Sequence, residues 1–489
     1  MSMVADSQPS AGAVRAAHNS AFLLGSQILI KLSSFVIVIL LARYLKVSDF
    51  GIYSLALAVT SMLDIPAELG LDQLSIREIA RDRRNIGRFI ANAAMIKIVL
   101  SSLILAVTAA VLFSSTTGGT GRSIFLLFTL TILPTGIFHT LLVVFMGIER
   151  MAAVAAGNIA FELIRLLLIL GVLLGGHGLV ALAWAYLAAY VLSIVLVYVL
   201  VRLRVGRVWA RPNIRLMLSM ARSSLPFMFY TLFFLIYFKI DFIMLAAMKG
   251  ENAVGTYAVA YRLMESLMFV PAAFTGAVFP SLSRLSASGR APVLAASRRT
   301  LRYMVMLGTP IGFGTTILAP RIIPFLFGDA YLDSVLLLQI IIWSIVMVFI
   351  NGICPVALNS FDRQLISVLV TGAGIVVNVG ANIILIPPLG AVGTSISTVA
   401  TESVTTLLFL YFFRRHIGSL GVFSFLYRPV AASLVMVLAL ELLRGLPLAV
   451  LIVMGAAIYL LTLILSRALG RSDLGFLYSV VRPARERGA

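Results

Sequence analysis

The chain has 489 residues, of which 61% are hydrophobic and 12% charged, about half the charged fraction of a soluble domain. This composition excludes a water-soluble protein, because too few polar groups are present to cover its surface. The net charge of +19 does not indicate nucleic acid, because the basic residues lie mainly in short loops between apolar runs. There they orient helices and meet anionic membrane lipids.

Metal and disulfide chemistry are also disfavoured. Cys354 is the single cysteine, so no internal disulfide can form, and the four histidines are scattered without ligand spacing. We therefore predict no metal, no cofactor and no catalytic constellation. Residues 1–19 are polar, and the apolar run that follows is too long for the core of a signal peptide, so no cleavable signal is expected.

Apolar runs long enough to cross a hydrocarbon core of ~30 Å recur from end to end. They predict an all-α polytopic membrane protein with about fourteen transmembrane helices. The predicted spans are 20–42, 50–72, 88–113, 123–147, 152–174, 179–201, 223–248, 254–280, 303–328, 332–358, 365–386, 390–413, 429–443 and 447–466.

Connections with many basic residues alternate along the chain with connections that have few, which is the pattern that indicates membrane orientation. Connections after the second, sixth, eighth and twelfth spans carry most of the arginines, and the connections between them carry few. We therefore predict a multi-pass protein of the cell (inner or plasma) membrane, with both termini in the cytoplasm.

Seven segments make up the predicted organisation. They are a cytoplasmic tail over 1–19, an N-lobe of helices 1–6 over 20–205, a cytoplasmic linker over 206–222, a C-lobe of helices 7–12 over 223–413, a linker over 414–428, helices 13–14 over 429–466 and a cytoplasmic tail over 467–489. Amphipathic segments at 213–220 and 281–303 are either surface helices that brace the lobes or ordinary linkers.

An internal repeat relates the two lobes. Residues 50–56 read Phe-Gly-Ile-Tyr-Ser-Leu-Ala and open the second span, whereas residues 254–260 read Val-Gly-Thr-Tyr-Ala-Val-Ala and open the eighth. Two six-helix units share one orientation, because six is even, so the repeat is parallel about an axis along the membrane normal. Such duplication predicts two lobes around a central path.

Residues 42–81 carry a family resemblance. Their motifs are Ala-Arg-Tyr-Leu at 42–45, the 50–56 segment, Glu-Leu-Gly-Leu at 68–71 and Arg-Glu-Ile-Ala-Arg at 77–81. Together they resemble the opening of the prokaryotic polysaccharide transporters. These are Wzx-like lipid-linked oligosaccharide flippases of the multidrug/oligosaccharidyl-lipid/polysaccharide exporter superfamily. Residues 239–241 and 254–257 resemble the corresponding part of the second lobe.

The resemblance implies a V-shaped, two-lobe transporter that rocks between states, with helices 1, 2, 7 and 8 around the cavity. It implies a polyprenyl-diphosphate-linked oligosaccharide as substrate, and protons or sodium ions as the coupling ion in ion-coupled members. Family members commonly carry Asp where this chain has Glu68, which keeps the charge but lengthens the side chain.

Charged residues within the spans gather on those same helices. Ionisable groups cost about 2.5–3.5 kcal/mol each on insertion scales, so they face an interior. The candidates for the substrate path are Lys31, Asp64, Lys239, Asp241, Arg262 and Glu265. A lipid diphosphate needs cations in a water-filled cavity, which the two lysines and the arginine could supply. The alternative is charge balance within a lobe, as between Lys31 and Asp64 or between Lys239 and Asp241.

Two further pairs lie three residues apart on one helix face. For Glu162 and Arg165 we predict a structural ion pair. For Arg262 and Glu265 an ion pair and a role in the cavity are equally supported.

Asp64 and Glu68 lie four residues apart with Pro66 between them, and they are the candidates for the coupling ion. Two carboxylates beside a backbone carbonyl freed by proline could bind a proton or a sodium ion. The alternative for Glu68 is an ion pair with Arg77 or Arg81.

We predict a flippase for surface polysaccharide biosynthesis that works by alternating access. Its expected partners are membrane lipids, the lipid-linked glycan, H⁺ or Na⁺, and a polysaccharide polymerase with glycosyltransferases. The first alternative is a cation-coupled exporter of drugs or small solutes. The second is a membrane glycosyltransferase or polymerase, which the short outer loops disfavour because such enzymes need a platform outside the bilayer.

Overall fold

A computed structural model describes residues 11–114 and 119–468. This described part is helical and contains no strand. It holds 13 helical stretches long and apolar enough to cross a membrane. The longest, Leu235–Ser286, is divided at Gly250, where the backbone leaves helical geometry (φ 79°, ψ −179°). Counting it twice confirms the predicted all-α membrane fold of about fourteen helices.

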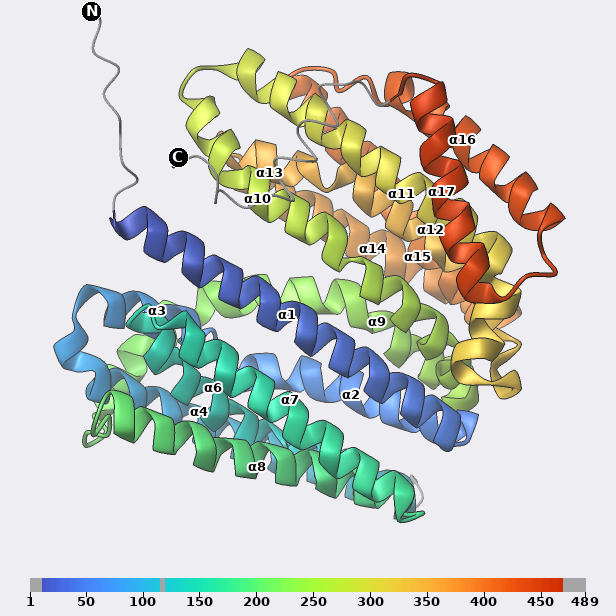
Figure 1. The fold of residues 1–489 in the computed structure, drawn as a ribbon. Coiled ribbons are helices and arrows are strands. Elements are labelled where there is room, and N and C mark those ends of the chain that lie inside the picture. Colours follow the sequence, from blue (N-terminus) through green and yellow to red (C-terminus); the bar gives the residue numbers. More distant parts are fainter. Residues whose placement is uncertain (1–10, 115–118, 469–489) are drawn as a thin grey trace, which may run out of the picture. The chain divides into compact units, whose positions relative to one another are not determined.

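The chain divides into two compact units, Met1–Gly255 and Thr256–Ala489. The first unit contains the following elements (Figure 1): α1 (Ala11–Tyr44), α2 (Val47–Glu68), α3 (Leu71–Arg81), η1 (Arg83–Asn85), α4 (Ile86–Ser114), α5 (Gly119–Leu130), α6 (Ile132–Gly147), α7 (Met151–Leu174), α8 (Leu179–Arg204) and most of α9 (Ile214–Leu267).

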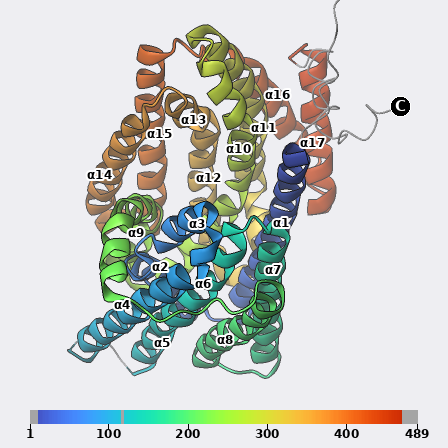
Figure 2. The same ribbon diagram turned by 90° about the vertical axis from the view of Figure 1, so that its left-hand side faces the viewer.

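The predicted second span is two helices. Leu69 and Gly70 both adopt left-handed backbone conformations (φ 54° and 70°), which end α2 and turn the chain into α3. The short α3 is amphipathic and buries Leu71, Leu74 and Ile79. Figure 2 shows it beside α4 and α6.

Three other predicted spans are each interrupted three residues before a proline. The interruptions fall at Thr131, Met268 and Gly352, and the prolines are Pro134, Pro271 and Pro355. Proline has no N–H, so it cannot bond the carbonyl four residues back, and one intrahelical hydrogen bond is missing there. The backbone at Thr131, Met268 and Gly352 stays right-handed helical, so each span continues through the interruption. Four other prolines, at 280, 310, 320 and 324, remain inside continuous helices.

The segment 213–220 is the first turns of α9 rather than a separate surface helix. The Asn213 side chain accepts from the backbone N–H groups of Arg215 and Leu216, which caps α9, and the Asn213 N–H donates to Asn92 Oδ1 at 2.7 Å. Met220 packs with Leu71 and Leu74 of α3. This packing places the start of α9 in the first unit, whose boundary falls at Gly255 rather than in the predicted linker 206–222.

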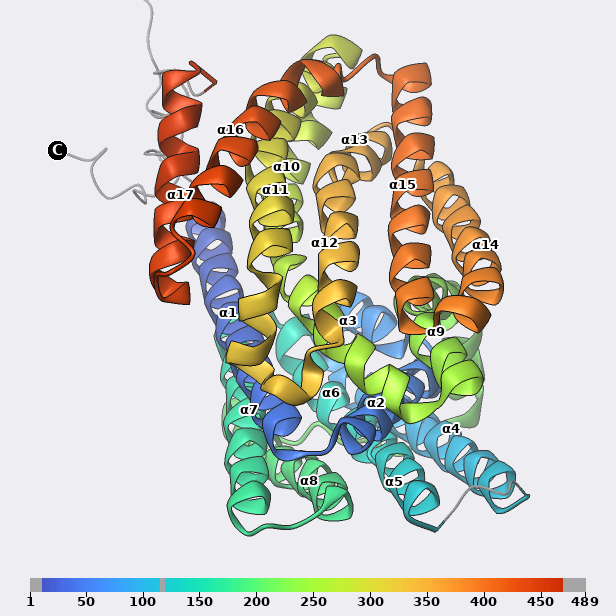
Figure 3. The ribbon, with the colours of Figure 1, turned by 90° about the vertical axis from the view of Figure 1, so that its right-hand side faces the viewer.

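The second unit contains the end of α9 and the following elements (Figure 3): α10 (Phe269–Ser286), α11 (Arg290–Phe327), η2 (Asp329–Tyr331), α12 (Ser334–Asn351), α13 (Ile353–Asn359), α14 (Gln364–Leu389), α15 (Ala391–His416), α16 (Val422–Leu442) and α17 (Leu448–Leu465). The segment 281–303 is likewise the end of α10 and the start of α11. The short thirteenth span is extended at its N-terminal end, because α16 begins at Val422.

Arginines of α11 fasten the terminal pair α16–α17 near both of its ends. Arg298 donates to the carbonyl of Ser419 just before α16, and Arg302 donates to that of Ala468 just after α17. At the opposite end of α11, Arg321 donates to the carbonyls of Arg444 and Leu446 in the turn between the two helices. These carbonyls lie in connections outside the helices and so have no intrahelical partner, and the arginine bonds satisfy them.

Candidate functional site

The cations predicted for the substrate path lie on two helices, Lys31 on α1 and both Lys239 and Arg262 on α9. Lys31 is exposed on α1, and Lys239 lies on α9 with its ammonium 5.6 Å from the centre of the Phe242 ring. Asp241, two residues further along α9, is 2% exposed. Since both residues of α9 are in the first unit, this unit holds four of the six path candidates.

Arg262 and Glu265 are the two candidates in the second unit. They form an ion pair at 2.8 Å, with 27% and 26% of their side chains exposed. The ion pair that their spacing of three residues allowed is therefore present. Both side chains are nevertheless open enough to be reached by a ligand.

The coupling-ion candidates belong to a larger cluster. Asp64 and Glu68 lie near the inner end of α2, and the charged groups acting on Asp64 are Lys97 of α4 and Asp72 of α3. Lys97 is 2% exposed and donates from Nζ to Asp72 Oδ1 at 2.6 Å. Glu68 is close enough to Asp72 for the two carboxyl groups to interact. Three carboxyl groups and one ammonium therefore meet where α2, α3 and α4 converge.

Asp72 was missed in the sequence because the second span was predicted to continue through it. The spacing of four residues from Asp64 to Glu68 to Asp72 is the signal that could have found it. The predicted alternative partners of Glu68 were wrong, because Arg77 and Arg81 both pair with Glu78, at 3.0 and 3.3 Å.

Pro66 lies inside α2 between the first two carboxyl groups. Because proline has no N–H, the carbonyl of Met62 lacks its usual intrahelical donor one turn earlier. A carbonyl released in this way adds a further oxygen close to Asp64 in the sequence. Together with the carboxyl groups it forms an oxygen-rich end of α2 that suits a small cation.

Glu162 and Arg165 form the predicted ion pair, at 2.5 Å, on α7. The guanidinium also donates to Ser34 Oγ of α1 at 3.0 Å and lies 5.4 Å from the centre of the Tyr186 ring of α8. Tyr186 in turn shares a 2.5 Å hydrogen bond with Tyr53 of α2. Arg165 thus connects α7 to two other helices, which is a structural role.

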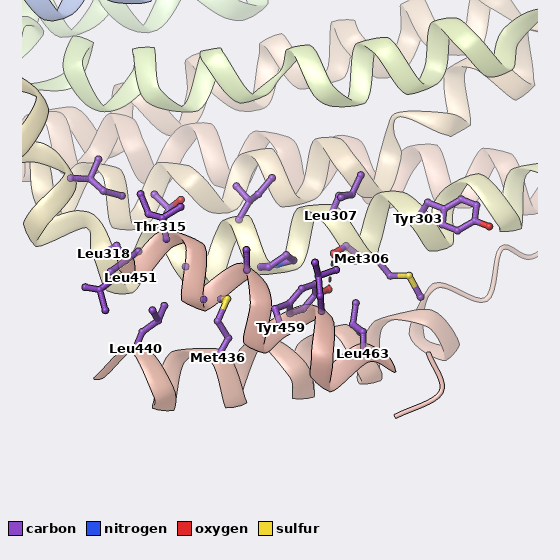
Figure 4. Close-up of a pocket in the computed structure, with 18 of the residues that line it drawn as sticks. Tyr303, Met306, Leu307, Thr315, Leu318, Met436, Leu440, Leu451, Tyr459 and Leu463 are labelled. Carbon is purple, nitrogen blue, oxygen red and sulfur yellow. Dashed lines mark hydrogen bonds between the residues drawn. The ribbon is translucent and has the colours of Figure 1, made fainter. Parts of the chain in front are cut away.

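The second unit contains an apolar cavity of about 500 Å³ between α11, α16 and α17 (Figure 4). Leu318, Met436, Leu451 and Leu463 are among the side chains that surround it. Tyr459 contributes a hydroxyl, but that group already donates to the Met306 carbonyl at 2.6 Å. The cavity therefore suits a hydrocarbon chain. Its position could not be predicted, because it depends on how three distant segments pack.

Comparison with known proteins places these features in a family. Residues 16–286, more than half of the chain, match the model of the family described as polysaccharide biosynthesis protein. The probable low-salt glycan biosynthesis flippase Agl15 of Haloferax volcanii is 22% identical over 374 residues, which cover 76% of this chain and 78% of that protein.

Solved structures share the fold at low sequence identity. The lipid II flippase MurJ in an inward closed conformation gives a TM-score of 0.73 at 12% identity, with 93% of this chain and 100% of that chain covered. An inward-facing multidrug resistance MATE transporter of the MOP superfamily gives 0.63 at 16% identity, covering 80% and 95%.

Proposed function

Because the chain belongs to the polysaccharide biosynthesis protein family, we propose that it is a flippase that moves a polyprenyl-diphosphate-linked oligosaccharide across the membrane. The observation that carries this proposal is the coincidence of site and family. All six path candidates, from Lys31 to Glu265, lie within the matched residues 16–286. The similarity to a glycan flippase over three quarters of the chain points the same way.

The cations have a direct role in this proposal. Lys31 and Lys239 of the first unit bind the diphosphate, whose clustered negative charge could not otherwise enter the bilayer. Arg262 is the cation that the second unit offers to the same kind of group. Asp241 and Glu265 hold the neighbouring cations in place and keep the path from retaining the diphosphate too tightly. The sugars follow the diphosphate through the hydrated part of the path.

The apolar cavity between α11, α16 and α17 accommodates part of the polyprenyl chain. Its lining is almost entirely hydrocarbon, and the arginine bonds near both ends of α16–α17 keep the three helices together around it. A lipid chain there would remain in an apolar environment while its head group changes sides.

The carboxyl groups Asp64 and Glu68, with Asp72, take up the coupling ion, H⁺ or Na⁺. Lys97 supports this assignment, because one buried ammonium balances only one of three neighbouring carboxyl groups. A single positive charge bound there would reduce the remaining repulsion.

We place the protein in the cell membrane with both termini cytoplasmic, next to the glycosyltransferases that make the glycan and the polymerase that uses it. The distribution of arginines supports this orientation. Transport is favoured over a transferase or polymerase because the described outer connections are short. For example, only residues 45–46 join α1 to α2.

Neutralising both lysines tests the flippase proposal. The double variant K31Q/K239Q should lose most flipping of a fluorescent polyprenyl-diphosphate oligosaccharide in proteoliposomes, because both first-unit cations that receive the diphosphate are gone. In a deletion strain it should leave lipid-linked repeat units on the cytoplasmic leaflet.

The matched control is K46Q/K249Q, which removes two exposed lysines near the outer ends of the helices. It should behave like the parent protein. Normal flipping by K31Q/K239Q at normal protein levels would overturn the site assignment. A different outcome would favour the small-solute exporter that the MATE-like fold also allows. In that case neither the parent protein nor the control would flip the lipid, and the parent would export cationic drugs.

A further inference from the structure

Two glycines bring the outer ends of α2 and α9 into backbone contact. A Cβ atom on Gly51 would lie 2.8 Å from the carbonyl carbon of Glu251 and 3.0 Å from the nitrogen of Gly255. A Cβ atom on Gly255 would lie 3.0 Å from both the carbonyl carbon and Cγ1 of Val47. In each case the carbonyl oxygen is closer still. The contact is therefore reciprocal, and no side chain fits on either glycine.

This contact explains the glycines of the internal repeat. Gly51 and Gly255 are the second residues of the matching segments 50–56 and 254–260. Each glycine meets the backbone of the residue four positions before the other, Glu251 or Val47. The repeat therefore builds a nearly symmetric crossing, which we call the outer crossing, from residues 47–51 and 251–255. All of these residues belong to the first unit.

A third glycine brings α9 against the inner end of α2. A Cβ atom on Gly70 would lie 2.6 Å from Phe227 Cβ and 2.9 Å from both Met228 N and Ser224 O. We call this contact the inner crossing. Gly51 and Gly70 are separated by about 28 Å along a helix at 1.5 Å per residue, which is close to the thickness of the hydrocarbon core. The two crossings therefore lie at opposite faces of the membrane.

Three of the six path candidates and both coupling-ion candidates lie between the crossings. Asp64 and Glu68 lie between Gly51 and Gly70 on α2, and Lys239 and Asp241 lie between Phe227 and Glu251 on α9. In this structure both ends of the α2–α9 pair are thus closed by backbone contacts, and the charged stretch lies between them.

We propose that the outer and inner crossings are the two gates of the transport path, and that one opens while the other stays closed. The proposal rests on the proposed flippase function. Backbone contact at glycine suits a gate, because weak Cα–H···O contacts can separate and reform without side chains having to interlock again. Gly250, whose φ of 79° interrupts α9, allows residues 251–255 to move separately from the membrane-crossing part of the helix.

Alanine at each crossing should open one face selectively. The reporter is Ser61→Cys in a Cys354→Ala background, because Ser61 is three residues from Asp64 on the same helix face. G51A and G255A should each increase labelling by a membrane-impermeant maleimide added outside by about fivefold or more, since a small differential destabilisation of the closed state shifts the population. G70A should increase labelling from the cytoplasmic side in inverted vesicles.

Three control variants separate gating from general damage. G171A and G276A add a methyl group where nothing lies within 4 Å, and should label like the parent. G70N tolerates the positive φ of Gly70 but still adds a side chain, so it should act like G70A if the crossing matters rather than the turn.

Labelling of G51A and G255A equal to that of G171A would overturn the gate proposal, as would increased labelling from the same face in all three crossing variants. Labelling needs no substrate, so its outcome is independent of the flipping assay. If the gates fail, the flippase proposal still stands; if flipping fails while labelling changes as expected, the crossings open as described but in a different transporter.

Discussion

Pairing stabilises the buried charges of the first unit. Lys97 is almost fully enclosed and bonds Asp72, and Arg165 is held by Glu162, Ser34 and an aromatic ring. Charges of this kind are expensive within a bilayer unless a partner is present. The cluster around Lys97 contains more negative than positive charge, whereas Glu162 and Arg165 form a balanced pair. This difference in net charge distinguishes the candidate ion site from the structural ion pair.

Removal of the Lys97 ammonium should destabilise the protein strongly. K97M leaves Asp72 facing Glu68 and Asp64 without a counter-ion, and breaking a buried pair in this way costs about 3–5 kcal/mol. We expect a clearly lower melting temperature of the detergent-solubilised protein. The matched control is R77Q, which removes an exposed partner of Glu78 and should cost at most about 1 kcal/mol. Equal melting temperatures of the two variants would contradict the proposal that Lys97 offsets repulsion between the carboxyl groups of this cluster.

Three predicted spans each lose one intrahelical hydrogen bond without ending. The interruptions before Pro134, Pro271 and Pro355 follow one rule, so they are predictable in position once the helices are known. The bonds from α11 to the ends of α16 and α17 follow no such rule. They join residues more than 100 positions apart, as in the bond from Arg298 to Ser419.

Filling the apolar cavity should impair transport without unfolding the protein. A456W places a large ring among the residues that line the cavity on α17, so the polyprenyl chain would be excluded. We expect a several-fold lower flipping rate with an unchanged or higher melting temperature, because filling a void adds packing contacts. L461W changes a residue of the same helix that does not line the cavity, and it is the control. If A456W flips substrate as fast as L461W, the lipid chain does not use this cavity.

At the scale of the whole molecule, the proposed path, the proposed gates and the proposed coupling ion would have to act together. The carboxyl cluster lies at the inner end of α2, next to the inner crossing at Gly70. An ion bound there is therefore placed to change how readily that end of the α2–α9 pair separates. The coupling free energy is the difference in ion affinity between the two states of the gate.

Removing a charge from the cluster should uncouple transport from the ion gradient. D64N should still flip substrate down its own gradient, but the rate should no longer respond to an imposed proton or sodium gradient across the vesicle. D329N, which changes an exposed acid between α11 and α12, should keep the full response. A normal gradient response in D64N would exclude Asp64 as part of the coupling site.

The amino-acid sequence by itself determined the class of protein and the approximate positions of its helices. Lipid solvation demands long apolar runs with all backbone groups bonded internally, so membrane helices can be recognised from local stretches of sequence. The sparse charges within those runs also made Lys31, Asp64 and Lys239 candidates for the substrate path without any structure. The Glu162–Arg165 pair was predictable for the same reason, since partners three residues apart meet on one helix.

Tertiary structure alone decided which distant groups meet. Asp72 and Lys97 are 25 residues apart, and their ion pair depends on the turn at Gly70 that carries α3 back against α4. The apolar cavity and the two glycine crossings depend on helices packing at distances that local patterns do not encode. Gly51 and Gly255 were visible as a repeat, but the reason for them, a shared backbone contact, exists only in the folded chain.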